Sequence, residues 1–168
     1  MATIKNSQLF EKHTGILTKD ACVVLMKTEW NASIVNQLER GCIAQLEEAG
    51  VKKIIVISVP GAIEIPFAIS HFWRHATKKN KPDAFIALGC IIQGETPHFD
   101  YVCQSVTNGV LHLNLNLPVP TIFGVLTVLN EEQAVNRIGG KDGHKGEEAA
   151  MTAIKMMNLT YLSKKKKN

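Results

Sequence analysis

The segment Gly94-Glu95-Thr96-Pro97-His98 combines residue types that could hold an anion beside a proton-transfer group. Thr96 has the character of a helix N-cap and Pro97 that of a first helical residue, and a helix N-terminus offers backbone N–H groups to an anion. We expect Glu95 to turn its carboxylate away and to present its backbone N–H. His98 would lie in the first turn as a candidate for proton transfer, although a lone histidine is more often structural.

Two other side chains could bind a planar, polar ligand. Trp30 follows an apolar segment, and its ring could either cap the core or stack on a heterocycle. Glu64 lies in a turn near a helix start, where its carboxylate could either cap the helix or accept hydrogen bonds from hydroxyls and ring N–H groups. The residue types alone leave both pairs of alternatives open.

Basic residues gather around the glycine-rich segment 139–146. Arg137, Lys141 and Lys145 lie in or beside it, and an arginine can hold a phosphate with two parallel hydrogen bonds. A solvated basic loop explains these residues equally well. The segment is not a Walker A phosphate loop, because His144 stands where a second glycine should precede the lysine.

No metal and no other cofactor is expected. His71 and His75 have the i, i+4 spacing of metal ligands, but no third ligand is evident and an exposed helix face explains them more simply. No Gly-x-Gly-x-x-Gly motif follows a predicted strand, which argues against a dinucleotide site.

The elements that must position these residues alternate along the chain. Apolar, β-branched runs predict strands at 21–27, 53–58, 84–90 and 121–127. Periodicity, caps and stops predict helices at 33–48, at 65–78, from 97 onward, at 130–138 and at 147–162. Apolar strands separated by helices imply an α/β protein, a three-layer α/β/α sandwich around a four-stranded parallel sheet. Ligands collect at the carboxyl ends of such strands, and most of the candidates follow strands.

Length and composition favour one folded domain at residues 21–162. The chain has 168 residues, of which 45% are hydrophobic and 20% charged, as is usual for a single globular domain. Residues 1–20 are a polar leader without the apolar core of a signal peptide, and no apolar run approaches the ~18 residues of a membrane span. We therefore expect a cytoplasmic protein with no membrane partner.

The net charge of +4 resides in the tail, 163–168. Four of the 19 basic residues are Lys164 to Lys167, and the rest of the chain has 15 basic and 15 acidic residues. A nucleic-acid binder carries a basic patch on its folded body, so a solvated tail without a nucleic-acid partner is the better interpretation. The cysteines have the pattern of buried, reduced thiols. They are Cys22, Cys42, Cys90 and Cys103.

An ordered set of motifs resembles the lumazine synthase family over about residues 21–162. The motifs are Trp30-Asn31, Val59-Pro60-Gly61-Ala62-Ile63-Glu64-Ile65-Pro66, the run LGCIIQGETPHFDYV from Leu88 to Val102, IFGVLT from Ile122 to Thr127, Glu132-Gln133-Ala134, Arg137 and Lys145-Gly146. The resemblance implies a flavodoxin-like fold. It also implies an enzyme of riboflavin biosynthesis that condenses 5-amino-6-(D-ribitylamino)uracil with 3,4-dihydroxy-2-butanone 4-phosphate to give 6,7-dimethyl-8-ribityllumazine, phosphate and water.

The same resemblance implies residue roles. Trp30 would stack on the pyrimidine, and Phe123 would reach the pocket from a neighbouring subunit. The uracil and ribityl pocket would be lined by Ala62, Ile63, Glu64, Cys90, Ile91 and Ile92. The butanone phosphate would be bound by Glu95, Thr96 and Arg137, with support from Lys145, and His98 would transfer the proton. Cys90 and Gln93 depart from the threonine and the basic residue expected in many members.

The resemblance further implies a homo-oligomer. The family forms pentamers, and the short 139–146 connection favours the closure of twelve pentamers into an icosahedral shell. The main alternative is a non-catalytic flavin- or lumazine-binding protein on the same scaffold. Such a protein would dispense with His98 and Arg137, and both are present.

Overall fold

Hydrophobic patterning located the long elements to within a few residues. The computed structural model describes residues 20–165, with side chains as far as residue 163. The strands are β1 (Cys22–Thr28), β2 (Lys53–Val59), β3 (Ala84–Ile92), β4 (Thr121–Val128), β5 (Ile138–Gly140) and β6 (Gly143–His144). The helices are α1 (Ala32–Glu48), α2 (Ile65–His75), α3 (His98–Asn116), α4 (Glu131–Val135) and α5 (Lys145–Lys165), and a 3-10 turn (Ala62–Glu64) precedes α2.

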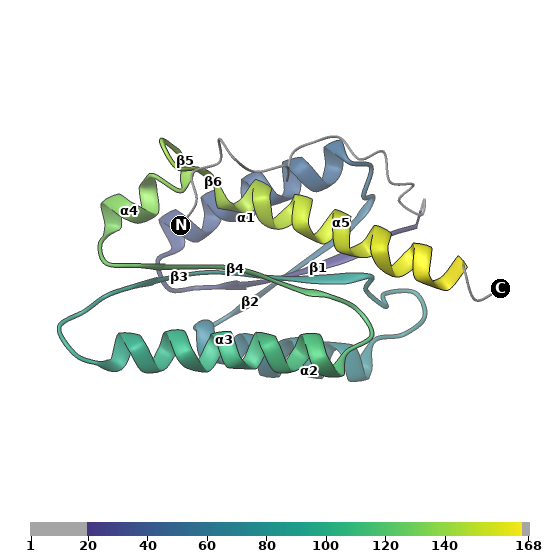
Figure 1. Ribbon diagram of the computed structural model, residues 1–168, viewed down its shortest axis with the longest axis horizontal. Helices are drawn as coiled ribbons and strands as arrows, with labels where there is room; N and C mark the ends of the chain where they lie inside the picture. Colours follow the sequence, from purple (N-terminus) through teal and green to yellow (C-terminus); the bar gives the residue numbers. More distant parts are fainter. Residues whose placement is uncertain (1–19, 166–168) are drawn as a thin grey trace.

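The first four strands form one parallel sheet in the order β2-β1-β3-β4. α1 and α5 cover one face of this sheet, and α2 and α3 cover the other (Figure 1). The central strands β1 and β3 are buried along most of their length, as expected where helices cover both faces of a parallel sheet. The predicted three-layer α/β/α sandwich, of flavodoxin-like type, is confirmed.

Side chains of β1 alternate between two cores, because successive residues of a strand point to opposite faces. Val23 and Leu25 pack toward α1 and α5, whereas Val24 and Met26 pack toward α2 and α3. Full burial of one such side chain stabilises the fold by roughly 1.5–3 kcal/mol. The two cores therefore fix the strands firmly, and with them the loops that leave the carboxyl edge of the sheet.

The start of α3 differs by one residue from the predicted start. The helix begins at His98, Pro97 occupies the N-cap position, and no side chain caps it. The carbonyl of Pro97 accepts the N–H of Asp100 at 3.0 Å, so the proline closes the first turn from outside the helix. The N-cap predicted for Thr96 was wrong, but His98 still lies in the first turn.

The glycine-rich segment folds into a hairpin rather than an open connection. β5 and β6 pair antiparallel, so the helix predicted to continue to residue 138 ends at Val135. Gly139 and Gly143 have φ values of 111° and 82°, a left-handed region that glycine adopts without a steric penalty. α5 then begins at Lys145, two residues earlier than predicted.

All but the last residue of the predicted leader and half of the predicted basic tail fall on residues 1–19 and 166–168, which lie outside the described part of the chain. Among the helices within residues 20–165, none has the length and apolar character needed to cross a membrane.

Candidate active site

A cavity of about 460 Å³ opens at the carboxyl ends of the first three strands. The segments after β1 and β2, the end of β3 and the first turns of α3 meet there, as the rule for parallel sheets predicts. Its lining residues are Thr28, Trp30, Asn31, Gly61, Ala62, Ile63, Glu64, Cys90, Ile91, Ile92, His98 and Val102. Eight of the residues singled out in the sequence thus lie around one cavity.

Trp30 does not cap the core. The side chain is 74% exposed, and it borders the cavity beside the turn that contains Gly61. A Cβ atom placed on Gly61 would lie 3.7 Å from Cδ1 of Trp30 and 3.0 Å from Oε2 of Glu64. The absence of a side chain at Gly61 therefore lets the Glu64 carboxylate and the Trp30 ring lie close to this turn, on the wall of the same cavity.

Glu64 occupies the N-cap position of α2 but makes no side-chain cap hydrogen bond. Glu64 thus stands at the helix start, where the dipole favours a carboxylate, but its side chain does not bond the free N–H groups of α2. Its side chain is exposed and lines the cavity. A carboxylate in that position can accept hydrogen bonds from a ligand.

Asn31 belongs to one of the sequence motifs but was given no role there, and it joins two walls of the cavity. Its Nδ2 donates to the carbonyl of Cys90 at 2.8 Å, which ties the segment after β1 to the end of β3. Its carbonyl accepts the N–H groups of Ile34 and Val35, each at 3.0 Å, in the first turn of α1. Its φ of 55° is left-handed, a conformation that asparagine tolerates better than most residues. An asparagine directly after the exposed tryptophan was the available signal.

Cys90 gives the cavity a neutral wall. Burial and, to a smaller extent, the charge of Glu131 together raise the pKa of its thiol to about 11, so the protonated form dominates near neutral pH. Burial likewise raises the pKa of Cys42 to about 12. Cys22, Cys42 and Cys90 are buried as predicted, whereas Cys103 on α3 is partly exposed, and all four are free thiols.

These raised pKa values predict uneven alkylation, because the thiolate is the reactive form. In the folded protein at about pH 8, iodoacetamide should modify Cys103 first and leave Cys42 and Cys90 unmodified. All four cysteines should react when the protein is unfolded in denaturant, and mass spectrometry of peptides measures each site. Equal labelling rates for Cys90 and Cys103 in the folded protein would contradict the prediction.

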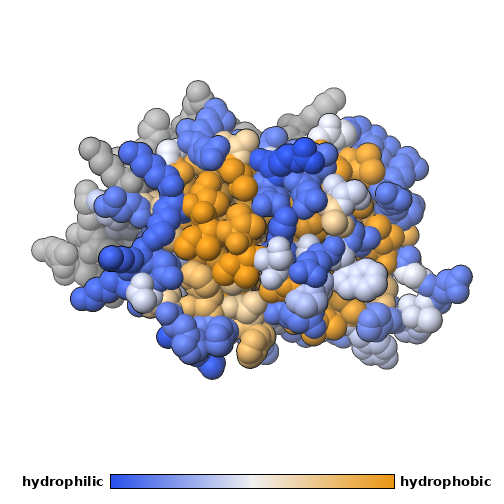
Figure 2. Space-filling view, turned by 180° about the vertical axis from the view of Figure 1, so that it is seen from behind, coloured by the Kyte–Doolittle hydropathy of each residue, from blue (hydrophilic) through white to orange (hydrophobic). Residues whose placement is uncertain are grey.

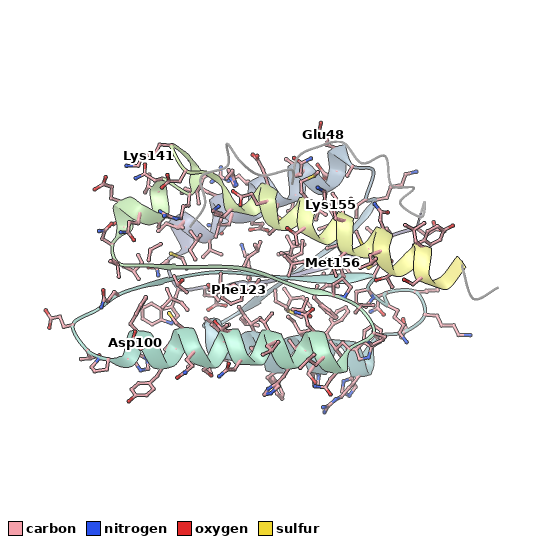
Figure 3. All side chains as sticks on the ribbon, viewed as in Figure 1. Glu48, Asp100, Phe123, Lys141, Lys155 and Met156 are labelled. Carbon is pink, nitrogen blue, oxygen red and sulfur yellow. The ribbon has the colours of Figure 1, made fainter. Side chains whose placement is uncertain are left out.

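Phe123 and Lys145 lie away from this cavity. They line a second cavity of about 860 Å³ that runs along β4 between α3 and α5. Figure 3 shows Phe123 at the front of the sheet, below Met156 of α5 and above α3. The Nζ of Lys145 is paired with the Glu148 carboxylate at 2.8 and 2.9 Å. Neither side chain reaches the Trp30 cavity within one chain.

Glu95 and Thr96 are exposed in the segment between β3 and α3, beside His98 but not in the cavity lining. They precede a helix whose first N–H groups have no acceptor within the helix itself. A ligand seated against His98 could therefore extend toward this segment. The predicted orientation of the Glu95 side chain stays a prediction.

Arg137 is held at the end of α4. Its Nη1 donates to the carbonyl of Gln133 at 2.7 Å and lies 3.3 Å from Oδ2 of Asp142. Its Nε is buried and has no hydrogen-bond partner within the described residues. Lys141 is exposed at the tip of the hairpin and points away from the sheet (Figure 3). Arg137 and Lys145 are neighbours, because the N–H of Lys145 donates to the carbonyl of Arg137 at 2.8 Å. Their side chains pair with different carboxylates, those of Asp142 and Glu148.

Comparison with known proteins gives a consistent result. The family model described as 6,7-dimethyl-8-ribityllumazine synthase matches residues 20–161. Proteins of that name are similar to this chain: one from Porphyromonas gingivalis is 46% identical over 143 residues, 84% of this chain and 86% of the relative. One from Parabacteroides distasonis is 44% identical over 138 residues, which cover 81% of this chain and 84% of the relative. One from Bacteroides fragilis is 42% identical over 139 residues, which cover 82% of this chain and 94% of the relative.

Proposed function

Because this chain belongs to the 6,7-dimethyl-8-ribityllumazine synthase family, we propose that its cavity condenses 5-amino-6-(D-ribitylamino)uracil with 3,4-dihydroxy-2-butanone 4-phosphate. The protein is a transferase of riboflavin biosynthesis. The observation that supports this reaction best is the meeting of Trp30, Glu64 and His98 around one cavity at the carboxyl edge of the sheet.

The reaction requires positioning and modest proton transfer. An amine attacks the ketone and water leaves to give an imine, and phosphate then leaves by elimination. The second amine attacks the remaining carbonyl group and closes the ring with loss of a second water. Holding both reactants in one cavity removes much of the entropic barrier to the first attack. A single imidazole, His98, can move protons to and from the nitrogen and oxygen atoms involved.

The pyrimidine substrate occupies the Trp30 side of the cavity in this proposal. Its ring stacks on Trp30, and the Glu64 carboxylate accepts hydrogen bonds from ring N–H groups or ribityl hydroxyls. The other lining residues are Ala62, Ile63, Cys90, Ile91 and Ile92. The neutral thiol of Cys90 contributes shape rather than charge to this wall.

The phosphate of the second substrate lies near the start of α3. Backbone N–H groups of Glu95 and Thr96 face it there, and the positive end of the helix dipole favours its charge. Arg137 supplies the charged anchor through the part of its guanidinium that Gln133 and Asp142 leave available. Lys145 supports the site electrostatically from its pair with Glu148.

Mixing the two substrates with the purified protein tests this function directly. Formation of the fluorescent lumazine, with release of one phosphate for each product, is the expected result. The non-catalytic alternative predicts that lumazine or flavin binds while no product forms. A protein boiled before mixing provides the background rate.

Members of this family form homo-oligomers, and in our proposal two subunits complete each active site. Phe123 is 39% exposed on β4 and lies outside its own chain's Trp30 cavity. β4 is one edge of the described sheet and β2 is the other. Val56 of β2 is 37% exposed, and Figure 2 shows hydrophobic side chains gathered on the face seen from behind. Such apolar surface is typical of an interface.

Complementation tests the sharing of sites. Trp30→Ala and Phe123→Ala lie on opposite sides of the proposed interface, so co-expressed mutant chains should form some interfaces with both changes and some with neither. The activity of the mixture should therefore exceed that of either mutant alone. Native mass spectrometry verifies that mixed oligomers form. Mixed oligomers no more active than the average of the two single mutants would show that each subunit holds a complete site.

The proposed assembly is a pentamer, and the short 139–146 connection favours a shell of twelve pentamers. Light scattering should give a mass of about sixty chains, because cyclic pentamers can close further around symmetry axes. A species of only five chains would contradict the shell and leave the pentamer intact. We place the enzyme in the cytoplasm, with residues 21–162 as its one catalytic domain.

A further inference from the structure

The pairing of Arg137 with Asp142 has a consequence for phosphate binding. Oδ2 of Asp142 lies 3.3 Å from Nη1 of Arg137, and the two side chains are 32% and 16% exposed. Both groups therefore remain open to solvent on one side. A carboxylate and a phosphate are the anions that a guanidinium binds best, so the two compete for the same donors.

The backbone fixes Asp142 at this place independently of its side chain. The N–H of Asp142 donates to the carbonyl of Asn136 at 3.0 Å. A Cβ atom on Gly140 would lie 2.7 Å from Cα of Asn136, so the hairpin folds tightly against the end of α4. The backbone of the hairpin thus places the Asp142 carboxylate beside Arg137 through contacts other than the ion pair.

Arg137 is also held by more than Asp142. The 2.7 Å hydrogen bond from its Nη1 to the Gln133 carbonyl anchors the guanidinium to α4, and its Nε is a buried donor with no acceptor within the described residues. Loss of the Asp142 charge would leave the guanidinium in place with an additional donor available.

We propose that Asp142 is a positioning residue that competes with phosphate for the Arg137 guanidinium and so lowers the affinity of the site for phosphate groups. This inference rests on the proposed role of Arg137 as phosphate anchor. Inorganic phosphate is a product of the proposed reaction, and a tethered carboxylate that replaces it on the guanidinium favours its release. The residue weakens binding of the phosphate-bearing substrate and of the phosphate product alike.

Direct binding of inorganic phosphate tests this inference without requiring catalysis. Isothermal titration calorimetry at low ionic strength should show that Asp142→Asn binds phosphate about three- to tenfold more tightly than the wild type, as expected for removal of one nearby negative charge in a solvent-exposed site. The gain should shrink as salt is added. A purely structural role for Asp142 predicts the opposite sign, namely weaker binding.

Two matched variants separate the possible outcomes. Glu132→Gln removes one negative charge from an exposed position on α4 and should change phosphate affinity less than twofold. An equal gain in both variants would overturn the inference, as would unchanged or weaker binding by Asp142→Asn. Arg137→Ala should lose most phosphate affinity. If it does not, the phosphate role of Arg137 fails, and the inference fails with it.

The same effect should appear in steady-state kinetics as a split between substrates. In Asp142→Asn, the KM for the butanone phosphate and the inhibition constant of inorganic phosphate should fall by the same factor. The KM for the pyrimidine should stay within twofold of the wild type. A parallel change in both KM values would indicate a general distortion of the site and would contradict competition at Arg137.

Discussion

Replacement of Arg137 by alanine is expected to raise the KM for the butanone phosphate by roughly 10- to 100-fold, because charge-assisted hydrogen bonds contribute about 1.5–3 kcal/mol each to binding. The KM for the pyrimidine should stay almost unchanged, since Arg137 does not line the Trp30 cavity. Steady-state kinetics with each substrate varied in turn measures both values.

Two further variants test whether the effect depends on the guanidinium of Arg137. Arg137→Lys keeps the charge but loses the planar fork, so its KM for the phosphate substrate should lie between those of the wild type and Arg137→Ala. Arg40→Ala removes an exposed arginine of α1 and should have no effect. An equal rise of both KM values in Arg137→Ala would mean that the side chain supports the fold of the site rather than the phosphate.

Replacement of His98 by alanine is expected to lower kcat by roughly 10- to 100-fold, less than the ~10²–10⁴-fold usual for acid–base groups. Imine formation between two bound reactants proceeds partly through proximity alone, which explains the smaller effect. The KM values should change little, because Trp30, Glu64 and Arg137 still hold the substrates. Single-turnover measurements of lumazine formation isolate the chemical steps.

His112 provides a matched control for His98. It lies on the same helix, is exposed and does not line the Trp30 cavity, so His112→Ala should keep nearly full activity. A His98→Ala enzyme with an unchanged kcat would remove this residue from the mechanism. The reaction would then depend on the positioning of the two substrates and not on proton transfer by His98.

The fold and the place of the site were predictable because both depend on local patterns. Runs of β-branched residues located the four main strands, and the parallel arrangement placed their exits at one edge. The start of the short helix predicted from residue 130 also follows a local pattern, because Oδ1 of Asn130 accepts the N–H of Gln133 at 2.9 Å.

Features that depend on contacts between distant segments were not predictable in this way. The hydrogen bond from Asn31 to the Cys90 carbonyl joins residues far apart in sequence, so it cannot be predicted from the type of either residue. The glycines of the 139–146 segment signalled turns, but pairing of Ile138 with His144 depends on where α4 and α5 place the two strands. Phe123 lies outside the Trp30 cavity of its own chain, which the family resemblance implied but no local pattern indicates.

The helix layer that contains α1 and α5 has a consequence for folding during translation. α1 and α5 pack against each other on one face of the sheet, yet they are the first and the last helices within residues 20–165. During translation, the part of α1 that packs on α5 therefore remains uncovered until α5 leaves the ribosome, even if β1 and β3 already pack against the helix. A nascent or prematurely terminated chain exposes this surface to aggregation and to chaperones, so cellular quality control can distinguish a truncated product from a finished one.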